Sequence, residues 1–294
     1  MHREAANNLK GVMNMRPTTF GSLAIATALS AVLTGCPRED QSDEPMTQAE
    51  AREAMEESAV ESQAAALTTS SVEISTSFTI GKAVGEAARE LKTFIETQLP
   101  CAEIVLADAT LTVTYGAKPG NCTYRGQKFT GQHIVKVAKN DDEVVVDHEW
   151  KDLSNGVVKV SGTAHVTWDF DDQTRHLQHD LTWTRMKDGR TGRGQGDRVQ
   201  RPLAGGVAEG IEIDGSRSWT GPKGKWDLAI EGVEMRWVDP VPQAGTYRLA
   251  SPKGRSLELS FRRVDEDTIA VTVKNDTKAF TFDVSSAGSV EDES

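Results

Sequence analysis

The chain has 294 residues and is acidic, with 33 Lys and Arg against 44 Asp and Glu and a formal net charge of −11. Without residues 1–35, which hold three basic residues and one acid, the remainder has 30 basic and 43 acidic residues and a net charge of −13. Such a surface repels phosphate groups, so the charge excludes nucleic-acid binding and a polybasic membrane patch.

The first predicted element is an export signal. Arg3, Lys10 and Arg16 precede an apolar run over residues 20–33, and small residues follow it. The run is about 14 residues long, whereas a bilayer-spanning helix needs roughly 20, so we expect a removed signal and not a membrane span. The alternatives are an ordinary secretory signal with a chance cysteine, or a buried helix, although the run lacks the caps and polar face of such a helix.

The end of this run, Leu33-Thr34-Gly35-Cys36, resembles the lipobox of bacterial lipoproteins. The resemblance implies cleavage before Cys36, acylation of that cysteine with palmitate-like chains, and a signal peptide over residues 1–35. Since each buried methylene contributes about 0.8 kcal/mol, two chains suffice for stable membrane attachment. Position 37 is Pro and not Asp, which by the same resemblance favours the outer membrane of a Gram-negative envelope.

Cys101 and Cys122 remain as one pair once Cys36 carries lipid. In an exported protein this pair is expected to form a disulfide, with two buried thiols as the alternative. No His or second Cys lies at ligand spacing from either cysteine, so we expect no metal and no cofactor.

Residues 36–75 are rich in Ala, Glu, Ser and Thr and have few large apolar side chains. Such a segment buries too little surface to offset its ordering entropy, so it is predicted to be an acidic flexible tether. Thr47 and Glu50 match a capping box, which leaves a solvated helix open.

An amphipathic helix is predicted over residues 80–99. Apolar residues recur at steps of three and four, charged residues occupy the other side, and Pro100 ends the pattern. Its apolar stripe is expected to pack on a sheet.

From Cys101 onward the apolar period changes to two, most clearly over residues 158–170. Turn signals separate about a dozen such runs, and Asn155-Gly156 is the strongest, predicting a type I′ hairpin. The fold class is therefore mainly β, an antiparallel meander that forms a curled sheet, a sandwich or a barrel with the helix packed on it. A phase slip at Glu231-Gly232 predicts a turn or bulge.

The predicted domain boundaries follow from these segments. Residues 76–240 form the helix and main β domain, residues 241–284 a small C-terminal β unit after a Pro-rich joint, and residues 285–294 a disordered acidic tail.

Four short motifs have a plainer explanation than chemistry. His148-Glu149-Trp150-Lys151-Asp152 starts like a zinc-protease helix but lies in a strand, and His176 and His179 would lie on opposite strand faces. The Gly-rich run at residues 192–196 lacks a following helix and is expected to be a flexible loop in a positive spot, formed with Arg190, Arg193, Arg198 and Arg201. The acids at residues 169–172 lack the pattern of a calcium loop.

Tryptophans are the remaining candidates. They occupy the apolar phase of their strands, so core packing is the default and an aromatic ligand face is the alternative. The residues of this candidate face are Trp150, Trp168, Trp183, Trp226 and Trp237.

The sequence therefore predicts a lipid-anchored cell-envelope protein that is not an enzyme and serves as a binding or structural module, with the membrane as its partner through Cys36. The alternative is a carrier of an apolar ligand in a Trp-lined β cavity. An envelope enzyme is third, and it would require convergent His, Asp or Glu side chains in a cleft.

Overall fold

A computed structural model describes residues 45–76, 84–139, 144–169, 172–285 and 288–292. Residues 41–294 form one compact unit. The predicted signal segment and Cys36 lie outside the described residues.

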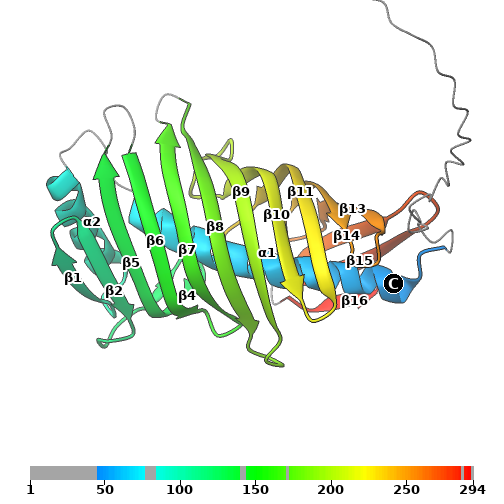
Figure 1. The fold of residues 1–294 in the computed structure, drawn as a ribbon, viewed down its shortest axis with the longest axis horizontal. Helices are drawn as coiled ribbons and strands as arrows, with labels where there is room; N and C mark the ends of the chain where they lie inside the picture. The colour runs from blue at the N-terminus through cyan, green and yellow to red at the C-terminus, as the bar shows by residue number, and fades with distance from the viewer. Residues whose placement is uncertain (1–44, 77–83, 140–143, 170–171, 286–287, 293–294) are drawn as a thin grey trace, which may run out of the picture. The chain divides into compact units, whose positions relative to one another are not determined.

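Two helices precede the strands (Figure 1), α1 (Gln48–Thr76) and α2 (Val84–Gln98). The strands are β1 (Glu103–Ala107), β2 (Thr110–Tyr115), β3 (Thr123–Tyr124), β4 (Gln127–Lys128), β5 (Thr130–Lys139), β6 (Val144–Ser154), β7 (Val158–Asp169), β8 (Thr174–Arg185), β9 (Thr191–Pro202), β10 (Ile211–Gly221), β11 (Gly224–Met235), β12 (Ala244–Ala250), β13 (Ser256–Arg263), β14 (Thr268–Lys274), β15 (Ala279–Ser285) and β16 (Val290–Asp292).

Fourteen strands form one antiparallel sheet, and the predicted meander is confirmed. Each strand pairs with its chain neighbours from β5 to β16, β1 and β2 continue the sheet beyond β5, and only the short β3–β4 hairpin is separate. The sheet is not closed into a barrel, because β1 and β16 are its two edges and do not pair. It is curled, since α1 contacts β6 and β7 and also β14 and β15, which lie far apart in strand order.

Buried and more exposed side chains alternate along the long strands, which gives the sheet an inner and an outer face. In β8, for example, Leu177, His179, Leu181 and Trp183 are buried while the residues between them are not. The inner residues form the core together with α1, as expected when one strand face packs and the other meets water.

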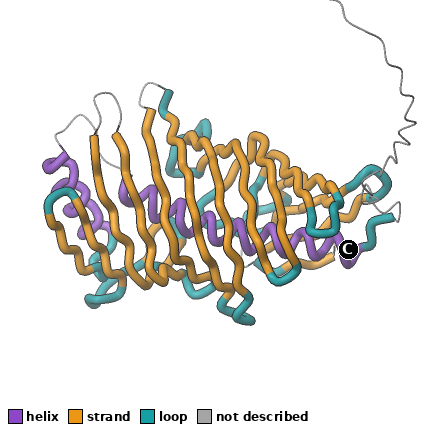
Figure 2. Tube along the Cα trace, in the orientation of Figure 1, coloured by secondary structure: helices purple, strands orange, loops and turns teal. Residues whose placement is uncertain are grey.

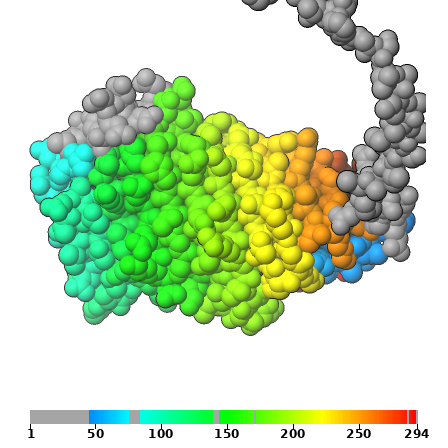
Figure 3. Space-filling view, in the orientation of Figure 1, coloured from blue at the N-terminus to red at the C-terminus, as the bar shows by residue number. Residues whose placement is uncertain are grey.

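The helix α1 corrects the largest sequence prediction, the flexible tether over residues 36–75, for its described part, residues 45–75, while residues 36–44 lie outside the described residues. Every side chain from Ala64 to Ser75 is buried, and α1 crosses the inner face of the strands (Figure 2). In the space-filling view, the blue N-terminal part of α1 is visible beside the yellow and orange surface of the later strands (Figure 3). This helix has no apolar stripe, yet it is buried on most sides because its acidic residues pair with arginines that are far away in the sequence. The local composition of the segment does not reveal these partners.

Two local predictions for the N-terminal part of this unit are confirmed. The capping box is present, with the Thr47 N–H donating to Glu50 at 3.0 Å and the Glu50 N–H donating to the Thr47 hydroxyl at 3.2 Å. Helix α2 buries its predicted apolar stripe, including Leu91 and Ile95, and contacts β1, β2 and β5.

The cysteine pair is also confirmed. Cys101, after α2, is joined to Cys122, ahead of β3, with a Cα–Cα distance of 5.4 Å.

The predicted division at residue 240 is wrong, because β12 pairs directly with β11 and the C-terminal strands extend the same sheet. The predicted disordered tail is also wrong in part, because β16 pairs with β15. The Pro-rich joint contributes Val241 to the core and Asp239 to an ion pair with Arg263, so its contacts are not those of a linker.

Three turn and bulge predictions have different outcomes. The ladder between β11 and β12 shifts between Glu231 and Glu234, which confirms the phase slip. At Asn155-Gly156 only Gly156 has a positive φ, of 87°, so the turn is not type I′. Its Asn155 side chain instead accepts hydrogen bonds from the Val157 and Val158 N–H groups, both at 3.0 Å.

The predicted flexible Gly-rich loop is instead part of β9. Its glycines face inward, where a Cβ would lie 2.4 Å from the Trp183 ring at Gly192 and 3.0 Å from the Trp219 side chain at Gly194. The motif therefore makes room for tryptophans of neighbouring strands, and this packing demand produces a pattern similar to a phosphate loop.

Candidate functional site

The most unusual feature of the molecule is a row of buried charge pairs between α1 and the inner face of the sheet. Glu57 pairs with Arg190, which lies before β9, and Glu61 pairs with Arg217 of β10. Glu73 pairs with Arg175 of β8 at 2.9 Å. Both members of the last two pairs are almost fully buried, so each charge depends on its partner for compensation.

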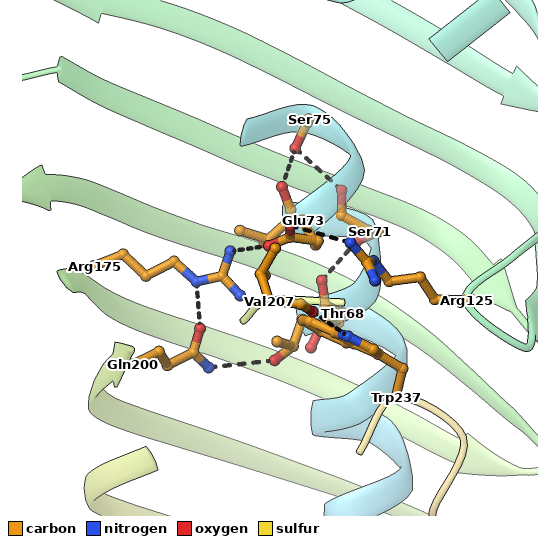
Figure 4. A network of polar contacts seen from close by, with 11 residues as sticks. Thr68, Ser71, Glu73, Ser75, Arg125, Arg175, Gln200, Val207 and Trp237 are labelled. Carbon is orange, nitrogen blue, oxygen red and sulfur yellow. Dashed lines mark hydrogen bonds and ion pairs between the residues drawn. The ribbon is translucent and has the colours of Figure 1, made fainter. Parts of the chain in front are cut away.

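Around Glu73 the contacts form a network (Figure 4). Arg175 donates through Nε to the side-chain Oε1 of Gln200 at 2.6 Å and through Nη1 to the Glu73 carboxylate at 2.9 Å. Arg125, from the turn between β3 and β4, reaches the other oxygen of Glu73 at 3.9 Å. Burial lowers the pKa of Arg175, while Glu73 opposes that shift. The two arginines therefore hold one carboxylate from opposite sides of the helix end.

Arg217 and Arg198 lie near one another on the inner face but differ in their partners. Burial alone would lower the pKa of Arg217, but Glu61 and Tyr247 outweigh it and raise that pKa. Arg198 donates to the His179 ring at 3.1 Å, and no ion pair joins it to a carboxylate in the described chain. Burial, followed by the charge of Arg217, lowers the pKa of Arg198 to about 9.

A pair of stacked histidines occupies the inner face of β5 and β6. His133 Nε2 lies 2.9 Å from His148 Nδ1, and the Tyr115 hydroxyl lies 3.3 Å from the remaining nitrogen of His133. Trp150 stacks on both rings. Burial lowers the pKa of His133 to about 3 and that of His148 well below its usual value. Both rings are therefore neutral at pH 7 and serve as packed hydrogen-bonding groups.

The other histidines follow the predicted strand geometry. His179 is buried on the inner face, while His176 is exposed and pairs with Asp197, so the two do not converge. Burial is the largest cause that lowers the pKa of His179, to about 2. Among the residues that the structure describes, no group of three His, Cys, Asp or Glu side chains is placed to hold a metal ion.

The four arginines predicted to form a positive spot are instead distributed over both faces of the sheet. Arg190 pairs with Glu57, Arg193 pairs with Asp180 at 2.9 Å, and Arg201 pairs with Glu212 at 2.7 Å. With Arg198 buried, the positive spot is absent from this region. At the predicted acidic turn, Asp169 accepts from the Asp172 N–H at 3.1 Å, and residues 170–171 lie outside the described part.

The candidate tryptophan face is divided among several places. Trp150 donates to Ser71 of α1 at 2.8 Å, and Trp237 donates to the Val207 carbonyl at 2.8 Å. Trp183 packs over Gly192, and Trp168, half-buried, lies under the Arg175 guanidinium. Trp226 stacks on Trp219 with ring centroids 6.1 Å apart. Trp150 contacts α1 itself, so at this position the helix occupies the place of a ligand on the candidate face.

The outer face carries a hollow of about 720 Å³ over β8 to β13. Sequence reasoning missed it, because most of its outward-facing residues occupy ordinary polar positions of their strands. Small side chains lie between longer polar ones that provide hydrogen-bonding groups. The small residues are Ser216, Ser218, Ala229, Ala250 and Ser256, and the longer ones are Gln178, Gln195, Asp197, Asp227 and Arg248.

Comparisons with known proteins returned no matching family model, no matching curated protein and no matching solved structure. Within the described ranges, neither helix has the length and apolar content needed to cross a membrane.

Proposed function

We propose that the protein is a lipid-anchored module of the cell envelope, non-enzymatic, that binds a partner on the outer face of its curled sheet. The anchor is Cys36, and the outer membrane is the proposed location. The lipobox-like residues 33–36 support the anchor, and the Cys101–Cys122 bridge fits the oxidising compartment that the anchor requires.

The position of α1 changes the geometry of the proposed attachment. Met46, just before α1, is fully buried, and it lies only ten positions after Cys36, with nine residues, 37–45, between them. At roughly 3.5 Å per residue, this connection spans at most about 35 Å. The folded unit would therefore stay close to the membrane surface, whereas the predicted tether of forty residues would have allowed a far longer reach.

The observation that favours a binding module over an interior carrier is the burial of α1 against the inner face. The helix contacts strands from β6 to β15 and takes up space in which a large apolar ligand would have to fit. The outer hollow, by contrast, is lined by uncharged small groups and hydrogen-bonding side chains. A shallow surface of mixed polar and apolar groups suits a protein partner.

Site-directed photo-crosslinking in intact cells tests this proposal. A benzophenone side chain at Ser218 or Ala229, inside the hollow, should give a discrete crosslinked species. The same side chain at Thr112, on the outer face of β2 and outside the hollow, is the control. Equal crosslinking at all three positions, or none at the first two, would contradict a partner site in the hollow.

A further inference from the structure

A second cavity, of about 400 Å³, lies at the N-terminal end of α1. Its walls come from α1, from the β10–β11 turn at Lys223, from the start of β11, and from the β12–β13 turn that leads into Leu257. Its volume is within the range of small-molecule sites, about 300 to 1,000 Å³. It is separate from the outer hollow, with which it shares no lining residue.

The cavity has an apolar part. Trp226 and Leu257 are both buried, and Pro252 lies against Gly224 beside them. The Trp226 indole N–H has no acceptor within the described residues. A buried donor without a partner costs free energy unless a ligand or water supplies the acceptor.

Charged side chains surround this apolar part. Lys223 pairs with Glu53 at 3.0 Å, and Lys253 and Arg255 share Glu50 at 3.3 and 3.6 Å. Three cations therefore meet two carboxylates, which leaves one positive charge in excess at a single place on a chain of net charge −11. An anion is the ligand charge that this arrangement attracts.

We propose that this cavity binds a single acyl chain carrying an anionic head group, with the chain against Trp226 and Leu257 and the head group at Lys223 and Lys253. A fatty acid and a lysophospholipid both have this chemistry. The inference goes beyond the proposed partner-binding function and does not depend on the lipid at Cys36.

The first test uses the full chain and 12-bromododecanoate, because bromine quenches the emission of a nearby indole. Saturable quenching is expected. Because Trp219 stacks on Trp226 with ring centroids 6.1 Å apart, the quenching should disappear only when both are changed, in Trp219→Phe with Trp226→Phe, while it persists in Trp168→Phe, a change of a tryptophan outside the cavity. Quenching that survives the double change would place the ligand elsewhere and overturn the proposal.

The second test addresses the charge of the ligand. The double reversal Lys223→Glu with Lys253→Glu changes exposed side chains, at 56% and 65% exposure, so the fold should persist. It should weaken bromododecanoate binding about tenfold or more, whereas Lys128→Glu on β4 should leave binding unchanged. Equal weakening by both changes would show that the overall charge of the protein, and not this cavity, controls binding of the probe, and it would overturn the proposal.

Competition identifies the ligand class. Laurate and lauroyl-lysophosphatidylglycerol should both displace the probe if the site recognises an anionic group on an acyl chain. The stronger competitor indicates whether the natural ligand is a fatty acid or a lysophospholipid. Affinity should rise about fourfold per methylene from octanoate to laurate. Dodecyltrimethylammonium should compete poorly. Displacement by that cation as strong as by laurate would overturn the proposed anion site, and none of these results bears on acylation of Cys36.

Discussion

Glu61 and Arg217 are 156 positions apart in the chain and form a buried ion pair that Tyr247 completes, with its hydroxyl accepting from Arg217 Nη2 at 2.7 Å. A buried pair of this kind adds little net stability, because desolvation of both charges offsets their attraction. Removal of one partner alone is strongly destabilising, because the remaining charge stays buried without compensation.

Glu61→Leu alone, or Arg217→Met alone, should therefore lower the free energy of unfolding by about 3–5 kcal/mol, while the two together should restore most of it. Urea denaturation measures this. Arg198→Met is the matched control, because Arg198 lacks a carboxylate partner in the described chain, and its effect should be much smaller. Additive losses in the double variant would contradict the pairing.

The buried histidines give the protein a defined sensitivity to acid. For His133, burial lowers the pKa from 6.5 to about 3, so between these values the unfolded chain binds a proton that the folded chain does not. Its contribution to stability is complete above pH 6.5 and is lost as the pH falls toward 3. His179, with its pKa lowered to about 2 by burial first, acts in the same direction.

Each of these histidines should therefore reduce the free energy of unfolding by about 1.4 kcal/mol per pH unit below 6.5. The measurement is urea denaturation at pH 7, 6, 5 and 4. His179→Gln should reduce the slope by the share of one histidine, about 1.4 kcal/mol per pH unit, and leave the share of His133, whereas His165→Gln, a change of an exposed ring, should preserve the profile. A profile with no slope between pH 6.5 and 4 would show that these rings are accessible to solvent protons in the folded state.

At the scale of the elements, the strands and α2 were predictable because their pattern is local. Apolar residues at period two in β7 and at steps of three and four in α2 face one core. The helix α1 was not predictable in this way. Its acidic residues suggest that the helix is exposed to solvent. The arginines that pair with them, Arg175, Arg190 and Arg217, follow more than 100 residues later in the chain.

The candidate sites were harder to predict than the fold. Trp226 was identified from its strand phase, and it lines the cavity at the start of α1, but the charges around that cavity come from two turns and one helix. Likewise, the outer hollow depends on small residues that happen to be adjacent across β10 to β13. Such neighbours are set by register, which requires the complete strand order.

Amide hydrogen exchange tests the position of α1. If residues 64–75 are buried between the helix and the sheet, their amides should exchange about as slowly as those of β7. A solvated tether or a detached helix would instead exchange within seconds to minutes. Fast exchange in this segment, with slow exchange in β7, would contradict the packing of α1.

At the scale of the whole molecule, the compact unit and the proposed anchor together describe a protein that stays near a membrane surface. Because α1 and the buried Met46 before it belong to the folded unit, only residues 37–45 lie between Cys36 and that unit. The disulfide and this short connection support the proposal of an exported protein attached by lipid at Cys36.

The most direct measurement is the intact mass of the protein purified from membranes. The account predicts a chain that begins at Cys36, lacks residues 1–35, and carries the added mass of acyl chains, while Cys36→Ala should remain unacylated. A mass that retains residues 1–35, or that shows an unmodified thiol at Cys36, would contradict the lipid anchor and the location that depends on it.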